Sequence, residues 1–162
     1  MISIQTADFS LDEEYKKLRE RAGDAGAIVT FTGLVREIYD SGSEATGQLK
    51  ENREGKISTL YLEHYPGMTE KSLQQISDQA ARTWPLLATR IIHRVGQLSA
   101  KDQIVFVGTA SAHRQDAFES AQFMMDYLKS NAPFWKKQSS ESGSVWIESK
   151  QSDTDALDRW QD

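Results

Sequence analysis

The pattern of hydrophobic and polar positions along the chain predicts three main helices and six strands. Apolar residues at helical spacing indicate amphipathic helices over residues 11–22, 68–84 and from about 113 to 131, because side chains three or four positions apart share one face. Runs rich in β-branched and aromatic residues predict strands over residues 2–9, 27–36, 57–65, 88–98, 103–111 and 145–150. A short helix is expected over residues 154–160.

The order of these elements favours an α+β fold. Strands occur both singly between helices and in adjacent pairs, which is typical of a mixed or antiparallel sheet covered by helices. The strand over residues 103–111 is almost continuously apolar, so we expect it to be central and buried on both faces. Gly33, inside the second strand, indicates a bulge or a close backbone approach.

Residues 1–162 are expected to form a single domain, because this length suits one hydrophobic core. Two polar stretches interrupt the periodic elements. Residues 39–56 are rich in Gly and Ser and have no periodicity, so we expect a mobile surface loop there. Residues 136–144 are also expected to form a polar loop.

Composition excludes several classes of chemistry. The chain has no cysteine, which rules out disulfides, thiolate metal sites and a cysteine that carries sulfur. It has only three histidines, so no metal site and no resident cofactor are expected. No signal peptide and no apolar run of membrane-spanning length is visible, so a cytoplasmic location is expected.

The balance of charge points to a small anionic substrate or an acidic partner. The formal net charge of −5 argues against general binding of nucleic acid, which usually needs a basic face. Basic residues nevertheless gather at a few places, which are Arg36, His93-Arg94, His113-Arg114, Lys129 and Lys136-Lys137. A local basic cluster on an acidic protein suits an anion that docks at one spot.

The stretch from Lys129 to Lys136 carries the strongest candidate chemistry. Pro133 lies between these two lysines and disfavours helical geometry at Ala132, so the helix should end near Asn131 and the chain should turn. The turn could bring the two ammonium groups together, which would lower their pKa values and make one lysine a nucleophile or general base. The alternative is a helix C-terminus with ordinary surface lysines, which the helix dipole favours.

Helix length indicates that a second subunit could complete the site. His113 and Arg114 open the helix that Lys129 closes, and about 15 residues of helix span roughly 22 Å. One small-ligand pocket cannot easily hold both ends of one helix. If these residues share a pocket, the helix start must come from a second copy of the chain, as in a twofold dimer.

Six motifs in order resemble the MoaE family, the catalytic (large) subunits of molybdopterin synthase. The motifs are Phe31-Thr-Gly-Leu-Val-Arg36, Leu62-Glu-His-Tyr-Pro-Gly-Met-Thr-Glu70, Ile92-His-Arg-Val-Gly96, Ser111-Ala-His-Arg114, Met125-Asp-Tyr-Leu-Lys129 and Ala132-Pro-Phe-Trp-Lys136. The resemblance runs from about residue 10 to residue 150, interrupted by the stretch 39–56.

The resemblance implies a fold, a reaction and partners. The fold would be α+β of the α/β-hammerhead type, in a central homodimer. A small ubiquitin-like sulfur-carrier subunit of the MoaD type would bind at each end to give a heterotetramer. Its C-terminal thiocarboxylate would donate sulfur, in two transfers, to cyclic pyranopterin monophosphate (precursor Z), which forms the dithiolene of molybdopterin. This is a step of molybdenum cofactor biosynthesis.

The resemblance also implies roles for individual residues. Lys129 and Lys136 would be catalytic, with Lys129 in acid–base or transient covalent chemistry at the pterin and Lys136 holding the thiocarboxylate terminus. The expected substrate-binding residues are Arg36, His113, Arg114, Phe31, Met125 and Lys150, with His113 and Arg114 supplied by the neighbouring subunit. Lys150 stands where the family usually has arginine, and it lacks the bidentate fork of that residue. Leu34 occupies a position that is often basic.

Two other readings remain open at this point. The chain could be a non-catalytic module that binds a ubiquitin-like tail, although paired lysines beside a pterin-sized pocket favour an enzyme. It could also be an α+β domain with scattered surface cations. The hypothesis of scattered surface cations predicts unchanged partner-dependent activity when Lys129 and Lys136 are replaced by alanine.

Overall fold

The computed structural model describes residues 1–36, 59–140, 143–147 and 156–160. Within these ranges the element order mixes strands and helices, as the sequence predicts. The elements are β1 (Ile2–Gln5), α1 (Leu11–Ala22), β2 (Ala27–Leu34), β3 (Thr59–His64), α2 (Met68–Thr83), β4 (Leu86–Arg94), β5 (Gly96–Ser99), β6 (Gln103–Ser111), α3 (Arg114–Asn131), β7 (Phe134–Ser140), β8 (Gly143–Ile147) and the 3₁₀ helix η1 (Ala156–Trp160).

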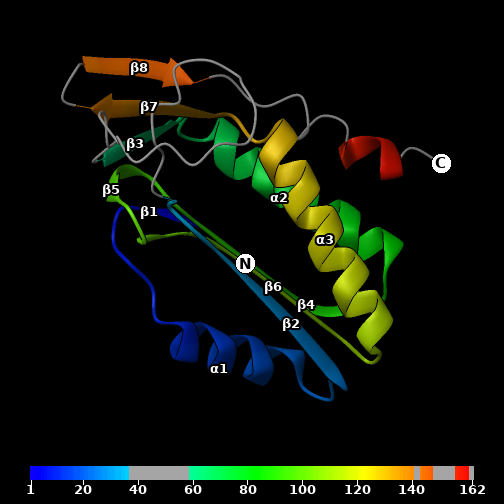
Figure 1. The fold of residues 1–162 in the computed structure, drawn as a ribbon. Coiled ribbons are helices and arrows are strands. Elements are labelled where there is room, and N and C mark those ends of the chain that lie inside the picture. The colour runs from blue at the N-terminus through cyan, green and yellow to red at the C-terminus, as the bar shows by residue number, and fades with distance from the viewer. Residues whose placement is uncertain (37–58, 141–142, 148–155, 161–162) are drawn as a thin grey trace, which may run out of the picture.

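The first sheet has the strand order β1-β4-β6-β2 and is mixed. β1 pairs with β4 in parallel, whereas β6 pairs with both β4 and β2 in antiparallel fashion. Helices α2 and α3 cover one face of this sheet and α1 covers the other (Figure 1). The predicted central position of β6 is confirmed, and so is the α+β class with its mixed sheet.

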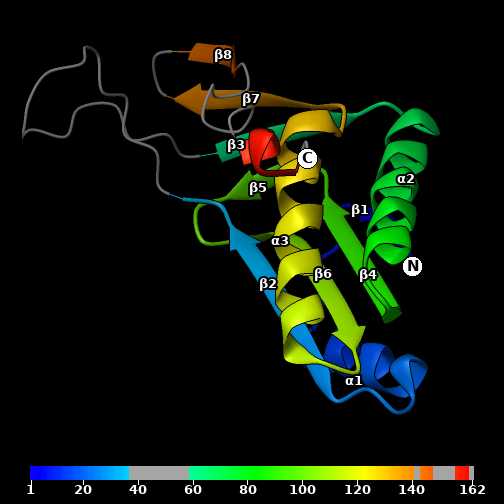
Figure 2. The same cartoon turned by 90° about the vertical axis from the view of Figure 1, so that its right-hand side faces the viewer.

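The second sheet is antiparallel, with the order β5-β3-β7-β8. It lies across the end of the first sheet, next to the C-terminal end of α3 (Figure 2). The single strand predicted over residues 88–98 is wrong, because the chain divides there into β4 and β5, which belong to different sheets. Gly96 adopts a φ of 85° at this point, a left-handed conformation that glycine accepts without steric cost.

The polar loop predicted over residues 136–144 is also wrong. Strands β7 and β8 occupy most of this stretch, and β7 pairs with β3 on one side and β8 on the other. The misreading has a physical cause: the polar sequence lacks apolar alternation, yet its backbone groups are satisfied by two neighbouring strands. The predicted polar loop at 39–56 lies outside the described residues.

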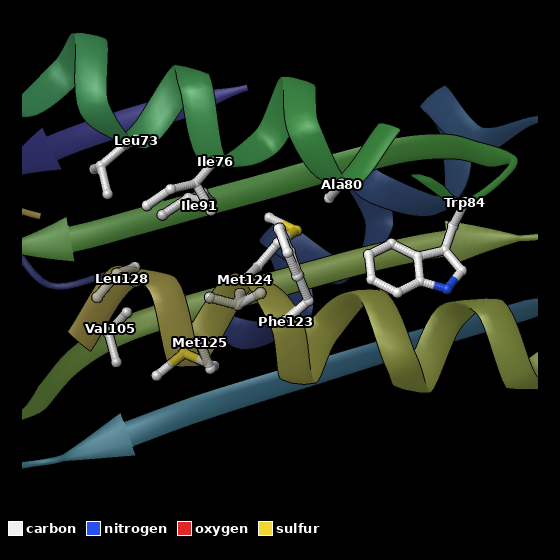
Figure 3. Close-up of a cluster of buried hydrophobic side chains, with 11 residues drawn as sticks. Leu73, Ile76, Ala80, Trp84, Ile91, Val105, Phe123, Met124, Met125 and Leu128 are labelled. Atoms are coloured by element: carbon white, nitrogen blue, oxygen red, sulfur yellow. The ribbon is translucent and has the colours of Figure 1, made fainter. Parts of the chain in front are cut away.

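The main hydrophobic core lies between the first sheet and the pair α2–α3 (Figure 3). Ile91 of β4 and Val105 of β6 project from the sheet toward the helices. The helices contribute a buried stripe, which consists of Leu73, Ile76, Ala80, Phe123, Met124, Met125 and Leu128. Met124 and Met125 belong to this core, which anchors the C-terminal half of α3.

Helix boundaries follow local capping chemistry. The predicted helix over residues 11–22 is confirmed, and the Ser10 side chain caps it by accepting a hydrogen bond from the Glu13 backbone N–H at 3.4 Å. The predicted end of α3 near Asn131 is also confirmed. At the other end of α3 the N-cap position belongs to His113. The Ser111 hydroxyl accepts a hydrogen bond from the His113 N–H at 3.4 Å.

No helix in the described part of the chain is both long enough and apolar enough to cross a membrane.

Candidate active site

Lys136 lies on the face of β7 that is turned toward the protein interior. Side chains alternate between the two faces of a strand, so Phe134 and Lys136 share one face while Trp135 and Lys137 share the other. Lys136 is paired with Leu62 of β3, which is only 1% exposed. The side chain of Lys136 is itself exposed, so this lysine lies where the inner face of the sheet reaches solvent.

The outer face of the same strand pair has a different character. Lys137 is paired with Tyr61, and Trp135 is paired with Glu63. The side chains of Tyr61, Glu63 and Trp135 are exposed. The two adjacent lysines of the sequence are therefore not equivalent. Strand geometry assigns Lys136 to the inner face and Lys137 to the outer face.

A buried histidine lies beside Lys136. His93, near the end of β4, is 6% exposed, and its ring stacks on Phe134 with 3.8 Å between ring centroids and 18° between ring planes. Burial lowers the pKa of His93 to about 4; the hydrogen bond to the Arg94 carbonyl opposes this shift, and the positive charge of Lys136 adds to it. The imidazole is consequently neutral around pH 7.

Lys129 occupies the last turn of α3, next to the corner that leads into β7. This corner contains only Ala132 and Pro133 between the helix and the strand. Met125 lies one turn before Lys129 on the same helix face and is buried in the main core. The lysine is thus carried by a well-packed helix end.

Helix α2 holds the corner between the two lysines. The hydroxyl of Thr69, which is fully buried, donates a hydrogen bond to the carbonyl of Pro133 at 3.1 Å. It also accepts one from the Tyr65 N–H at 2.9 Å. The Ser72 hydroxyl donates to the carbonyl of Asn131 at 3.3 Å. These bonds fix the turn that follows Lys129 and precedes Lys136.

Arg36 approaches the same end of the molecule. It follows Val35, which packs in a hydrophobic cluster with Leu62, the residue paired with Lys136. The β2 strand reaches this point through an irregularity between Gly33 and Leu34. This irregularity agrees with the bulge predicted at Gly33, and a Cβ at Gly33 would lie 2.7 Å from Cγ1 of the Val105 side chain, so the valine packs directly against the glycine backbone.

Phe31 lies earlier on β2, directly opposite Val107 of β6. Val107 belongs to the main core beneath α3, so Phe31 is on the α3 side of an edge strand, and it is 42% exposed. An exposed phenylalanine on this face is available to contact a ligand or a partner.

The other predicted site residues lie elsewhere. His113 and Arg114 are exposed at the beginning of α3, about 15 residues or roughly 22 Å from Lys129 along the helix axis. One chain therefore does not bring them to the lysines. Lys150 lies outside the described residues.

A shallow hollow with a volume of about 330 Å³ opens at the C-terminal end of β3, near the start of β7. It is lined by Glu63, His64, Tyr65 and Trp135. Nε2 of His64 is 3.6 Å from a carboxylate oxygen of Glu70. Among the described residues no group of three His, Asp or Glu side chains could hold a metal ion.

Two residues of this region were not singled out as site residues from the sequence. His93 is a polar residue in a strand with an apolar centre, Ile91-Ile92, and that contrast was a usable signal. Thr69 gave none, because a threonine in the first turn of a helix is ordinary. Its hydrogen-bond partner, the Pro133 carbonyl, is 64 positions away in sequence, so only the tertiary structure shows this contact.

Comparison with known proteins places the chain in a family. The family model described as "MoaE protein" matches residues 4–131. The molybdopterin synthase catalytic subunit of Escherichia coli K12 is 49% identical over 159 residues, which is 98% of this chain and 97% of that protein. The molybdopterin synthase catalytic subunit of Vibrio cholerae is 48% identical over 160 residues, which is 99% of this chain and 97% of that protein.

A solved structure agrees with the sequence comparison. The molybdopterin biosynthesis MoaE protein from Burkholderia ambifaria is 44% identical and superposes with a TM-score of 0.79, covering 99% of this chain and 97% of that one. The likeness therefore extends over nearly the full sequence and includes the fold, and the chain belongs to the MoaE family.

Proposed function

We propose that the chain is the catalytic subunit of a molybdopterin synthase. It transfers sulfur from the C-terminal thiocarboxylate of a small ubiquitin-like carrier to cyclic pyranopterin monophosphate. The observation that carries the proposal is 48–49% identity, over nearly the full length of both chains, to catalytic subunits of this enzyme. The absence of cysteine supports a partner as the sulfur donor, since the chain has no thiol of its own.

The corner between α3 and β7 supplies the catalytic groups of this proposal. Lys129 works on the pterin as an acid–base or transient covalent group, and Lys136 holds the thiocarboxylate terminus. Two features support the assignment to Lys136 over Lys137. Lys136 is on the inner face, opposite buried Leu62. Its positive charge also contributes to the lowered pKa of buried His93. A cation at this point attracts an anionic chain terminus.

The proposed substrate site is completed by a second copy of the chain. Arg36, Phe31 and Met125 come from the same subunit as the lysines, whereas His113 and Arg114 come from the partner in a homodimer. The support is geometric, because an 18-residue helix separates the two groups within one chain. A twofold axis would form two equivalent sites and leave each end for a carrier subunit, giving a heterotetramer.

Reconstitution tests the proposed reaction. The purified protein is mixed with the thiocarboxylated carrier and precursor Z, and molybdopterin is followed as a fluorescent oxidised derivative. We expect product with the wild type, strong loss with Lys129→Ala and Lys136→Ala, and near wild-type rates with Lys137→Ala. Carrier binding without product in the wild type would instead support a non-catalytic module that binds a ubiquitin-like tail. Equal activity of all variants would refute the site assignment.

A mixed-dimer experiment tests the shared site. Lys136→Ala and Arg114→Ala chains, each with little activity alone, are mixed and allowed to exchange subunits. Half of the dimers then contain one chain of each kind, and one of the two sites in such a dimer is intact. We therefore expect recovery to about a quarter of wild-type activity. No recovery after verified subunit exchange would mean that Arg114 acts within its own chain.

A further inference from the structure

His93 is a buried titratable residue that the proposed chemistry does not use. It lies in β4, in the first sheet, and its ring contacts Phe134 of β7, in the second sheet. Two rings at a centroid distance of 3.8 Å and an angle of 18° form a stacked pair. The contact therefore joins the two sheets at the point where β7 begins.

The orientation of the imidazole is fixed by a second contact. Nδ1 of His93 lies 2.8 Å from the backbone carbonyl of Arg94. A carbonyl oxygen only accepts hydrogen bonds, so Nδ1 carries the proton and Nε2 is the unprotonated nitrogen of the neutral ring. The ring is thus held at one edge by β4 and on one face by Phe134.

Burial, and to a smaller extent the electrostatic surroundings, favour a neutral His93 ring. Lys136 of β7 and His64 of β3 both act on it, and His64 is itself near Glu70 of α2. The neighbouring Arg94 side chain turns toward β1 and the chain after it, where it bonds the Thr6 carbonyl and Asp8, and it also bonds the carbonyl of Gln103.

Phe134 connects the stacked ring to the catalytic strand. It lies two residues before Lys136 on the same face of β7, a spacing of roughly 7 Å along a strand. The backbone of β7 sets where the Lys136 side chain begins, so a shift of this strand segment would move the ammonium group. A ring packed against Phe134 limits how the beginning of β7 can shift.

We propose that His93 is a positioning residue for Lys136. Its neutral ring, oriented by the Arg94 carbonyl and stacked on Phe134, fixes the strand segment that places the lysine amine at the reacting site. The inference rests on the proposed function of Lys136. It assigns to His93 no contact with substrate and no proton transfer.

Two substitutions at His93 distinguish the contribution of ring stacking from the contribution of the hydrogen bond. His93→Phe retains a planar ring against Phe134 but loses the donor to the Arg94 carbonyl. His93→Asn retains a donor near the position of Nδ1 but removes the ring. The single-turnover rate is measured in the reconstituted complex, with folding checked by circular dichroism. Because an aromatic pair contributes modestly, we expect His93→Asn to lower the rate by about threefold to tenfold, whereas His93→Phe retains most of it.

A double-mutant cycle distinguishes positioning from general support of the fold. Lys136→Arg keeps the positive charge but changes the geometry of the side chain. It provides a background that lacks the lysine amine whose position His93 is proposed to fix. If His93 acts through Lys136, adding His93→Asn to this background has little further effect on the rate. A full additional loss in the double variant would overturn the inference.

The outcomes separate this inference from the proposed function. Full activity of Lys136→Ala would refute the role of Lys136, and the inference would fall with it. If Lys136→Ala loses activity but His93→Phe and His93→Asn have equal rates, the assignment of the catalytic site holds and positioning by the His93 ring is refuted. That comparison decides the point even if Lys136→Arg has no measurable activity.

Discussion

Protonation of His93 should make the protein less stable as the pH falls from 7.5 to 5.0. Burial lowers the pKa of His93 to about 4, compared with 6.5 for an unperturbed histidine. In this window the unfolded chain binds a proton that the folded protein does not, so acid favours unfolding. With these two pKa values the loss between pH 7.5 and 5.0 is about 2 kcal/mol.

The measurement is urea unfolding at several pH values, at fixed protein concentration, for the wild type and for His93→Asn. Fluorescence of buried Trp84 reports the transition. The variant has its own loss of stability from the missing ring, but that loss does not depend on pH. The informative quantity is therefore the difference in slope, and the wild type should lose about 2 kcal/mol more than the variant.

Other titrating groups do not reproduce this difference. Burial alone raises the pKa values of Asp8 and Glu14, but hydrogen bonds and neighbouring arginines more than offset it and leave both lowered. The stability that these carboxylates contribute is lost at lower pH, and it is common to both proteins. Parallel curves for the wild type and His93→Asn, within about 0.5 kcal/mol, would refute the neutral buried state assigned to His93.

Three further substitutions test the frame around the site. Gly33→Ala should destabilise the protein by about 1–3 kcal/mol in urea unfolding, because the new Cβ would lie 2.7 Å from Cγ1 of Val105; an unchanged midpoint would contradict the close approach. Thr69→Val should cost about 1–3 kcal/mol and lower the reconstituted rate, since it removes the hydroxyl bonded to the Pro133 carbonyl; full stability and full activity would contradict a role in holding the corner. Trp160→Ala should lower stability by about 2 kcal/mol, seen as a lower melting temperature, because the indole packs partly buried against the main core; a melting temperature equal to that of the wild type would show that η1 contributes nothing.

Local sequence signals were sufficient to predict several elements. The α1 boundaries, the end of α3 and the central position of β6 all follow from sequence, because apolar spacing, capping residues and proline act within a few positions. The six motifs likewise carry the resemblance to the MoaE family, because each is a short stretch of sequence. Lys136 was a candidate for the same reason, since the proline, the aromatic pair and the two lysines are close in sequence.

The tertiary structure alone decided which elements share a sheet and which side chains meet. β7 has a polar sequence that does not alternate, and it became a strand because β3 and β8 satisfy its backbone on both sides. Lys136 faces inward and Lys137 outward only because the register pairs Lys136 with buried Leu62. The stack of His93 on Phe134 joins residues 41 positions apart in sequence. Contacts of this kind depend on how whole elements pack, and no short sequence window contains the partners that determine them.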